Sequence, residues 1–209
     1  MKIEVWSDTV CPWCYVGLKR LQKALELRPA IVAGVRWMPF ELNPDLPDGG
    51  MDRRQYMVQK FGDPDRFKGM QGAMQDVMSG LGIDYRPERQ TRMPNTRKSH
   101  MLIQAAATID RQTQIKETIL RAYFSGGRDI GDLQVLQELL APLGLEPVRV
   151  AELLDDVQLR AAVEQQESEA RRMQINGVPT FVFDRKIGFS GAQEVSVFLQ
   201  ALDRAAAAA

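Results

Sequence analysis

The two cysteines of this 209-residue chain stand three positions apart, as Cys11-Pro12-Trp13-Cys14, and they constrain its fold more than any other feature. Charged and apolar residues alternate before the pair as they do in a β-strand, and apolar residues recur at helical spacing after it. Pro12 suits the first position of a helix, because its missing N–H would have no partner there in any case. The sequence therefore predicts a strand, then the cysteine pair, then a helix.

This position of the pair predicts thiol redox chemistry. Only a thiolate attacks a disulfide, and the unpaired N–H groups and positive dipole end of a helix N-terminus stabilise a negative sulfur. We expect Cys11 to be the attacking thiolate and Cys14, one turn later, to resolve the mixed disulfide. Pro12 and Trp13 would shape the exposed face of the site.

Two other interpretations of the cysteine pair are less favoured. A structural disulfide across so few residues would restrain the unfolded chain only weakly. A closed zinc site needs about four ligands, and the chain offers two cysteines and one histidine, His100, so only carboxylates could complete it. We predict no metal.

Charge and hydropathy narrow the classes of partner. Lys plus Arg and Asp plus Glu each total 27, so the net charge is zero and we expect no nucleic-acid partner. The N-terminus lacks the long apolar core of a secretory signal, and no stretch approaches membrane-spanning length. We therefore expect a cytoplasmic protein without a membrane partner. In that reducing compartment an isolated Cys-x-x-Cys is more often catalytic than structural.

The order of the predicted elements suggests an α/β fold. Strand patterns cover residues 3–6, 34–42, 180–183 and 186–189, whereas helical periodicity dominates from about 51 to 173, with segments at 96–109, 114–124, 133–143 and 148–169. Residues 1–50 and 174–209 can form one mixed sheet if 51–173 is an all-helical insertion domain. Cys11 then lies at the carboxyl edge of the first strand, beneath the inserted helices.

Methionines are concentrated in the predicted insertion. Seven of the ten fall between Met51 and Met101, and Met70, Met74 and Met78 repeat at one-turn spacing. Such a stripe is usually core packing, but a flexible thioether surface would also suit varied substrates.

The chain resembles the thioredoxin-fold proteins similar to DsbA, and within them the FrnE-like group. The motifs that carry the resemblance span nearly the whole chain: Ser7-Asp8 before the cysteine pair, Pro94-Asn95-Thr96 with His100, Ala122-Tyr123-Phe124 with Arg128-Asp129-Ile130, Gly177-Val178-Pro179-Thr180-Phe181, and Gly191-Ala192-Gln193. Cys-x-x-Cys alone is common, whereas Cys-x-x-Cys with a late Val-Pro-Thr-Phe is much more specific.

The resemblance implies a thioredoxin-like mixed sheet and a cis peptide bond between Val178 and Pro179 that faces the cysteines. In such proteins the backbone of the residue before the cis-proline pairs with an extended peptide or with glutathione, so Val178 becomes a substrate contact. The resemblance also implies that backbone N–H groups of Ser190-Gly191-Ala192 hold a glutathione carboxylate, although Ser190 could simply cap the last helix.

Three further residues are candidates for the substrate pocket. Asn95 or Thr96 most simply caps the helix that carries His100, yet a helix N-terminus near the cysteines could also orient an anionic ligand. An isolated histidine on an amphipathic helix is most often structural, and the resemblance raises the chance of a pocket role only modestly.

The leading hypothesis is a thiol-disulfide oxidoreductase that acts on disulfide-containing proteins or small thiols, with no obligatory cofactor and with glutathione as a possible co-substrate. The alternative is a glutathione-dependent isomerase or transferase for a small aromatic or electrophilic substrate, as in the related 2-hydroxychromene-2-carboxylate isomerases and kappa-class glutathione transferases. Those relatives typically present a serine where this chain has Cys11. A third hypothesis is a non-catalytic, chaperone-like binder that uses the methionine-rich region. Relatives often pair, so a homodimer is possible.

Overall fold

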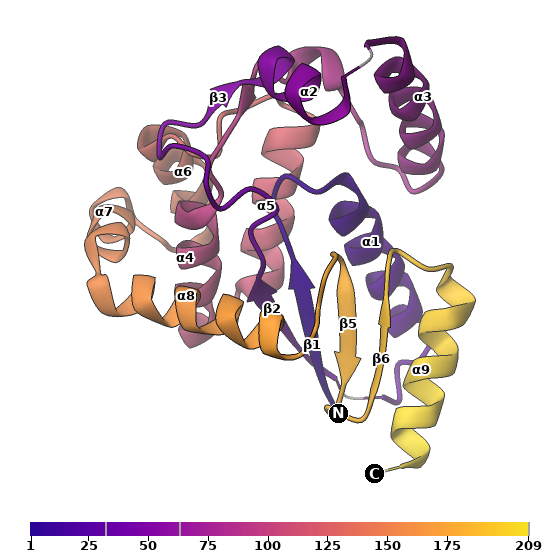
Figure 1. Cartoon of the computed structure of the whole chain (residues 1–209). Helices are drawn as coiled ribbons and strands as arrows, with labels where there is room; N and C mark the ends of the chain where they lie inside the picture. Colours follow the sequence, from indigo (N-terminus) through magenta and orange to yellow (C-terminus); the bar gives the residue numbers. More distant parts are fainter. Residues whose placement is uncertain (32, 63, 209) are drawn as a thin grey trace.

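A mixed four-stranded sheet lies at the centre of the molecule (Figure 1). The computed structural model describes residues 1–31, 33–62 and 64–208, except for the side chains of 64–68 and 70, which include that of Met70. The strand order is β2 (Gly34–Pro39), β1 (Lys2–Ser7), β5 (Thr180–Phe183) and β6 (Ile187–Ser190). β1 runs parallel to β2 and antiparallel to β5, with Val5 opposite Phe181. The first and last parts of the chain thus form one sheet, as predicted.

Side chains alternate along β1, so the two faces of the sheet pack against different helices. Ile3 and Val5 belong to the main hydrophobic core, as do buried residues of α1 (Pro12–Glu26) and α9 (Val195–Ala207), which lie side by side (Figure 1). Trp6, one position further along β1, packs on the opposite face with Ala170 of α8 (Val157–Arg172). This alternation is what a strand buried on both faces requires.

The remaining elements form the segment between the two halves of the sheet. They are β3 (Met51–Asp52), α2 (Arg53–Phe61), α3 (Pro64–Gly80), η1 (Pro87–Arg89), β4 (Arg92–Met93), α4 (Arg97–Ala105), η2 (Ala106–Ile109), α5 (Gln112–Phe124), α6 (Leu133–Leu140), η3 (Ala141–Leu143) and α7 (Pro147–Asp155). The predicted insertion is therefore helical, apart from the two-residue strands β3 and β4, which pair with each other.

Two predicted boundaries differ from the structure. The helix predicted over 148–169 is two helices, α7 and α8, because the Asp156 side chain caps α8 by accepting hydrogen bonds from the N–H groups of Gln158 and Leu159. Ser190, the candidate cap of the last helix, instead ends β6, and α9 begins at Val195.

The sheet and the inserted helices share one hydrophobic core, which joins Ile3 and Val5 of β1 to Ile115 and Ile119 of α5. Polar contacts strengthen this connection at Trp37 of β2, whose N–H and indole Nε1–H donate to Gln112 and Thr113 at the start of α5. The division into domains at 1–50 with 174–209 and 51–173 stays a prediction about chain organisation. Within the described residues, no helix is long and apolar enough to cross a membrane.

Candidate functional site at the cysteine pair

Both cysteines lie at the N-terminus of α1, as predicted. Cys11 occupies the N-cap position, Pro12 is the first helical residue, and the N–H of Cys14 donates to the Cys11 carbonyl over 3.0 Å. Both cysteines are free thiols, with no disulfide between them. Trp13 projects outward with 44% of its surface exposed, whereas Cys11 is 5% exposed and Cys14 is fully buried.

The surroundings of the two sulfur atoms differ. The Cys14 Sγ accepts a hydrogen bond from the backbone N–H of Asp8 at 3.4 Å. Burial, followed by the hydrogen bond and charge of Cys11, raises the pKa of Cys14 well above its ordinary value. Cys14 is therefore held as a thiol beneath Cys11, and Cys11 is the cysteine that faces the adjoining cavity.

The backbone before Pro179 lies directly against Cys11. The Val178–Pro179 peptide bond is cis, and the Val178 carbonyl accepts a hydrogen bond from the Cys11 thiol at 3.6 Å. Gly17 makes this approach possible, because a Cβ atom there would stand 2.9 Å from the Phe181 ring and 3.0 Å from the Pro179 ring. The structure thus brings Cys11 together with Val178 and Pro179, although Val178 lies 167 positions after Cys11 in the sequence.

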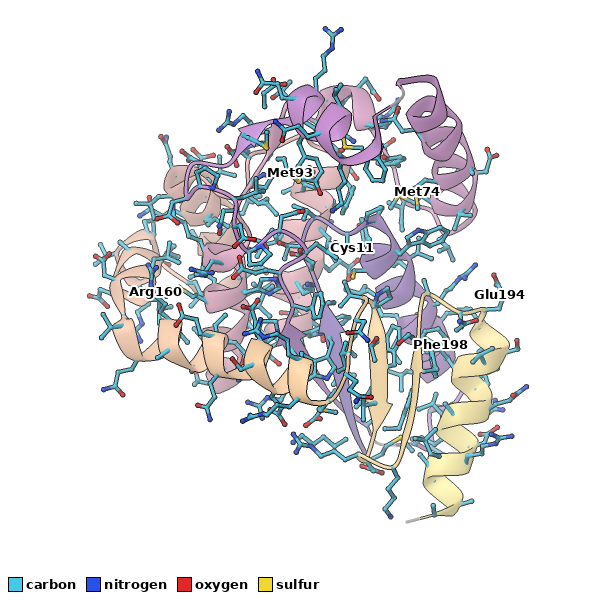
Figure 2. The ribbon with its side chains drawn as sticks, viewed as in Figure 1. Cys11, Met74, Met93, Arg160, Glu194 and Phe198 are labelled. Carbon is cyan, nitrogen blue, oxygen red and sulfur yellow. The ribbon has the colours of Figure 1, made fainter. Side chains whose placement is uncertain are left out.

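A cavity of about 330 Å³ opens beside Cys11. Pro12 and Trp13, which lie between the two cysteines, form part of its wall with Val178. Met74 and Met93 line it on the side away from the sheet (Figure 2). Met78, one turn from Met74, is instead fully buried in the core. The methionine stripe therefore serves both packing and the cavity wall.

Aromatic and cationic residues form another part of the cavity wall, and sequence reasoning did not single out most of them. They are Tyr56, Phe61, Tyr85, Tyr123, Phe124, Arg53 and Lys60. They come from α2, α5 and the loop before η1, which are far apart in the chain, so only the Ala122-Tyr123-Phe124 motif pointed toward the site.

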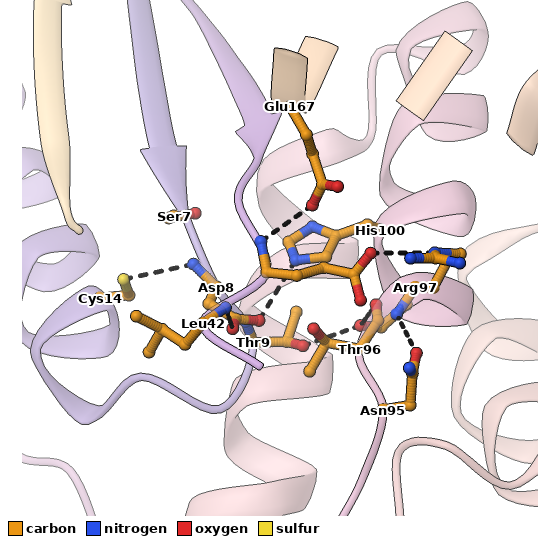
Figure 3. A network of polar contacts seen from close by, with 12 residues as sticks. Ser7, Asp8, Thr9, Cys14, Leu42, Asn95, Thr96, Arg97, His100 and Glu167 are labelled. Atoms are coloured by element: carbon orange, nitrogen blue, oxygen red, sulfur yellow. Dashed lines mark hydrogen bonds and ion pairs between the residues drawn. The ribbon is translucent and has the colours of Figure 1, made fainter. Parts of the chain in front are cut away.

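His100 lies behind the cysteine pair in a buried polar network (Figure 3). Its Nε2 is 3.2 Å from Oδ1 of Asp8, and Oδ2 of Asp8 accepts a hydrogen bond from the N–H of Leu42. Burial acts to raise the pKa of Asp8, but the hydrogen bond and charge of His100, the hydrogen bond from Leu42 and the charge of Lys116 together hold that pKa below its ordinary value. His100 thus fixes the loop between β1 and α1 from inside the protein.

Asn95 and Thr96 are also buried, at 5% and 4% exposure. The Asn95 side chain caps α4 by accepting from the N–H of Arg97, and it donates to the Leu46 carbonyl. Thr96 occupies the N-cap position without a side-chain capping bond. Neither residue, nor His100, is among the described residues that line the cavity, so the structure places all three behind the site rather than in it.

The segment Ser190-Gly191-Ala192 begins at the last residue of β6 and does not reach the described lining of the cavity. The Ser190 and Thr180 hydroxyls hydrogen-bond at 2.7 Å. The N–H of Gly191, which we expected to hold a carboxylate, donates instead to the Pro179 carbonyl at 2.7 Å, and the Ala192 carbonyl accepts from Arg20. This segment therefore stabilises the cis-proline position through the bond from Gly191 to Pro179. In the part of the chain that the structure describes, no cluster of side chains suits a metal ion.

Comparisons with known proteins agree with this geometry. A family model described as a DSBA-like thioredoxin domain matches residues 2–203. The structure is similar to that of a probable DsbA oxidoreductase from Streptomyces coelicolor, with 31% sequence identity, a TM-score of 0.89, and coverage of 99% of this chain and 90% of that one.

Two more distant structures share the fold. One is a 2-hydroxychromene-2-carboxylate isomerase, at 15% identity and a TM-score of 0.76, with 98% of this chain and 95% of that chain covered. The other is the cytosolic disulfide reductase DsbM from Pseudomonas aeruginosa with GSH, at 24% identity and a TM-score of 0.59, with 99% and 96% covered.

Proposed function

Because the chain belongs to the family of DSBA-like thioredoxin domains, we propose that it is a thiol-disulfide oxidoreductase in which Cys11 attacks and Cys14 resolves. The unequal burial of the two sulfur atoms carries this assignment. Cys11 faces the cavity at the N-terminus of α1, whereas Cys14 is fully buried and its pKa is raised by burial and by Cys11. Only Cys11 can meet a substrate disulfide.

The reaction proceeds in two exchanges. The Cys11 thiolate attacks one sulfur of the substrate disulfide, forms a mixed disulfide and releases the other sulfur as a thiolate. Cys14 then loses its proton and attacks the Cys11 sulfur, which releases the second substrate thiolate and leaves the Cys11–Cys14 disulfide. The same steps in reverse oxidise a substrate dithiol, so the direction depends on the reduction potential of the pair.

The substrate contacts follow from the position of the cis-proline. The Val178 carbonyl lies 3.6 Å from the Cys11 sulfur, so the backbone of an extended peptide or of a small thiol such as glutathione would bring its own sulfur against Cys11 by pairing with residue 178. Pro179 and Trp13 would bound this position. We propose a disulfide-containing protein or a small thiol as the substrate, in a cytoplasmic setting; a homodimer stays a prediction.

Trapping the mixed disulfide tests the proposal. We expect Cys14→Ser to accumulate a mixed disulfide through Cys11 with an oxidised peptide or with glutathione disulfide, detected as an added mass that dithiothreitol removes. Cys11→Ser should accumulate none and should lose insulin reduction. Full insulin reduction by a folded Cys11→Ser protein would refute the assignment.

A glutathione-dependent isomerase is the second candidate, because the fold is shared with a 2-hydroxychromene-2-carboxylate isomerase and the cavity wall is rich in aromatic side chains. Isomerase chemistry does not need the second cysteine. Turnover of a chromene carboxylate that survives Cys14→Ser, together with an absence of insulin reduction by the wild-type protein, would favour this candidate over the first.

A further inference from the structure

Lys116 of α5 is a buried lysine whose role the reaction above does not explain. Only 1% of its surface is exposed, and among the described residues no carboxylate lies within 4.0 Å of its ammonium group. Its contacts are the Ser7 carbonyl oxygen, at 3.5 Å, and the ring of Trp37, whose centroid is 5.9 Å away. A buried ammonium without an ion pair is costly, so a purely structural lysine here would be unfavourable.

One peptide group connects this ammonium to the resolving cysteine. The Ser7 carbonyl that Lys116 contacts and the Asp8 N–H that donates to Cys14 Sγ belong to the same peptide unit. A cation at the oxygen end polarises a peptide group and strengthens the donor at its nitrogen end. The charge of Lys116 is therefore transmitted to the Cys14 sulfur.

We propose that Lys116 is a positioning residue for the resolving step, favouring the Cys14 thiolate through the Ser7–Asp8 peptide group. This inference rests on the proposed function. Cys11 and Cys14 face Lys116 from the start of α1. Asp8, in the loop before α1, also faces Lys116 and is itself in contact with His100 of α4. Burial lowers the pKa of Lys116, and of these groups Cys14 opposes that effect most strongly.

The charge acts at one point in the reaction. In the mixed disulfide, Cys11 carries no charge, and Cys14 must lose its proton to solvent before its sulfur can bond to the Cys11 sulfur and expel the substrate thiolate. Burial opposes this ionisation, whereas Lys116 favours it. No further reactant is needed, because the substrate disulfide accepts the two electrons of the Cys11–Cys14 pair.

Stopped-flow oxidation by dithiobis(nitrobenzoate) separates the two exchanges, because each one releases a coloured thiolate. The variant is Lys116→Met, which keeps the length of the side chain without its charge. Lys186→Met is the matched control, because Lys186 lies on the far hairpin, where its ammonium donates to the Ala208 carbonyl. Far-UV circular dichroism and thermal melting establish that each variant is folded.

We expect Lys116→Met to slow the second release and to move the pH of its half-maximal rate upward by about one unit. One unit lowers the thiolate fraction about tenfold and raises the nucleophilicity of the remaining thiolate about threefold, so the net slowing at neutral pH is about threefold. The first release should change less, and Lys186→Met should change neither. An unshifted pH profile for the second release would overturn the inference.

A second neutral variant covers the case in which Lys116→Met does not fold. Lys116→Gln removes the charge but keeps an N–H donor for the Ser7 carbonyl. We expect the same slower second release and the same upward shift of its pH profile. An unshifted profile in a folded Lys116→Gln protein would refute the coupling. A different result would refute the proposed function itself, namely the absence of any coloured thiolate released by attack of Cys11.

Discussion

Asp8 and Glu41 are buried carboxyl groups near the cysteine pair, and their surroundings push their pKa values in opposite directions. Asp8 accepts hydrogen bonds from two backbone N–H groups and contacts His100, which lowers its pKa despite burial. Burial and the neighbouring carboxylate of Glu167 raise the pKa of Glu41 to about 7, although Arg97 donates to its Oε1 at 2.9 Å. Oε2 of Glu41 is buried without a hydrogen-bond partner among the described residues.

Glu41→Gln should therefore change how stability depends on pH. Because the folded-state pKa of Glu41 lies above its unfolded value, its contribution to stability is full below about pH 4.3 and is lost as pH rises through about 7. A glutamine still accepts from Arg97 and cannot ionise. We expect the variant to match the wild type near pH 4 and to be more stable by about 1 kcal/mol at pH 8, after allowance for screening.

Urea denaturation between pH 4 and 8 measures this difference. Glu164→Gln is the matched control, because Glu164 also lies near Arg97, at 3.9 Å, but its side chain is half exposed. The control should show no pH-dependent gain. A Glu41→Gln protein that is less stable than the wild type at pH 8 would contradict the assignment of a raised pKa.

Among single residues, the sequence identified those whose chemistry depends on local position. Cys11, Pro12 and Cys14 form their site within one helical turn, so spacing was enough to predict it. The family resemblance supplied Val178 and Pro179. Lys116 could not be predicted, because a lysine on an amphipathic helix is ordinarily exposed and its burial here depends on the packing of α5 against the sheet.

Among the elements, α1 and β5 make the contact on which the site depends. Gly17 lies one and a half turns after Cys11, and the absence of a side chain there lets α1 approach Phe181 and Pro179 of the adjoining strand region. The rings that a Cβ would meet are rigid and buried on the strand side. The distance between Cys11 and the Val178 carbonyl therefore depends on a glycine.

Gly17→Ala should separate α1 from β5. We expect a loss of about 1–3 kcal/mol in the free energy of unfolding from overpacking, together with slower attack by Cys11, because Val178 moves with Pro179. Urea denaturation and the first thiolate release with dithiobis(nitrobenzoate) measure the two effects. Gly72→Ala in α3 is the control: a Cβ there meets nothing within 4 Å, so the variant should gain up to about 1 kcal/mol from helix propensity. Equal behaviour of the two variants would show that the contact is unimportant.

Elements with strong local signals were predicted well, and those set by tertiary contacts were not. The strand and helix around Cys11 follow from alternation and helical spacing. The break between α7 and α8 does not, because apolar periodicity continues past Asp156 and neither glycine nor proline marks the end. β3 and β4 pair over two residues each, too few to leave a period in the sequence. Pairing with β5 likewise extends β6 through Ser190, the candidate cap of the last helix.

For the whole molecule, the arrangement of a mixed sheet with a helical insertion followed from the order of the elements, since the first and last strands had to meet. The cavity did not follow, because its wall combines the cysteine loop with side chains of α2, α3 and α5 and the loops near β4. Which helix faces turn toward Cys11 is decided by packing between segments far apart in the sequence.

The shared core predicts that the sheet and the inserted helices unfold as one unit. The three tryptophans, at 6, 13 and 37, all lie in the first fifty residues and report on the sheet region, whereas most of the helical circular dichroism signal comes from the insertion. Trp37 is joined to the insertion by hydrogen bonds to Gln112 and Thr113 and by the bond from Gln104 to its carbonyl. We therefore expect the fluorescence and circular dichroism transitions in urea to coincide in the reduced protein.

Gln112→Ala sharpens this test. Gln112 is buried, accepts from the Trp37 N–H and donates to the Ile103 carbonyl, so its loss should cost about 1–3 kcal/mol and leave the Trp37 N–H without that partner. In a single cooperative unit both transitions move to lower urea together, whereas the exposed Gln114→Ala control leaves them in place. If the fluorescence transition separates from the circular dichroism transition, the sheet and the insertion are independent folding units, and the cavity between them can open without unfolding either one.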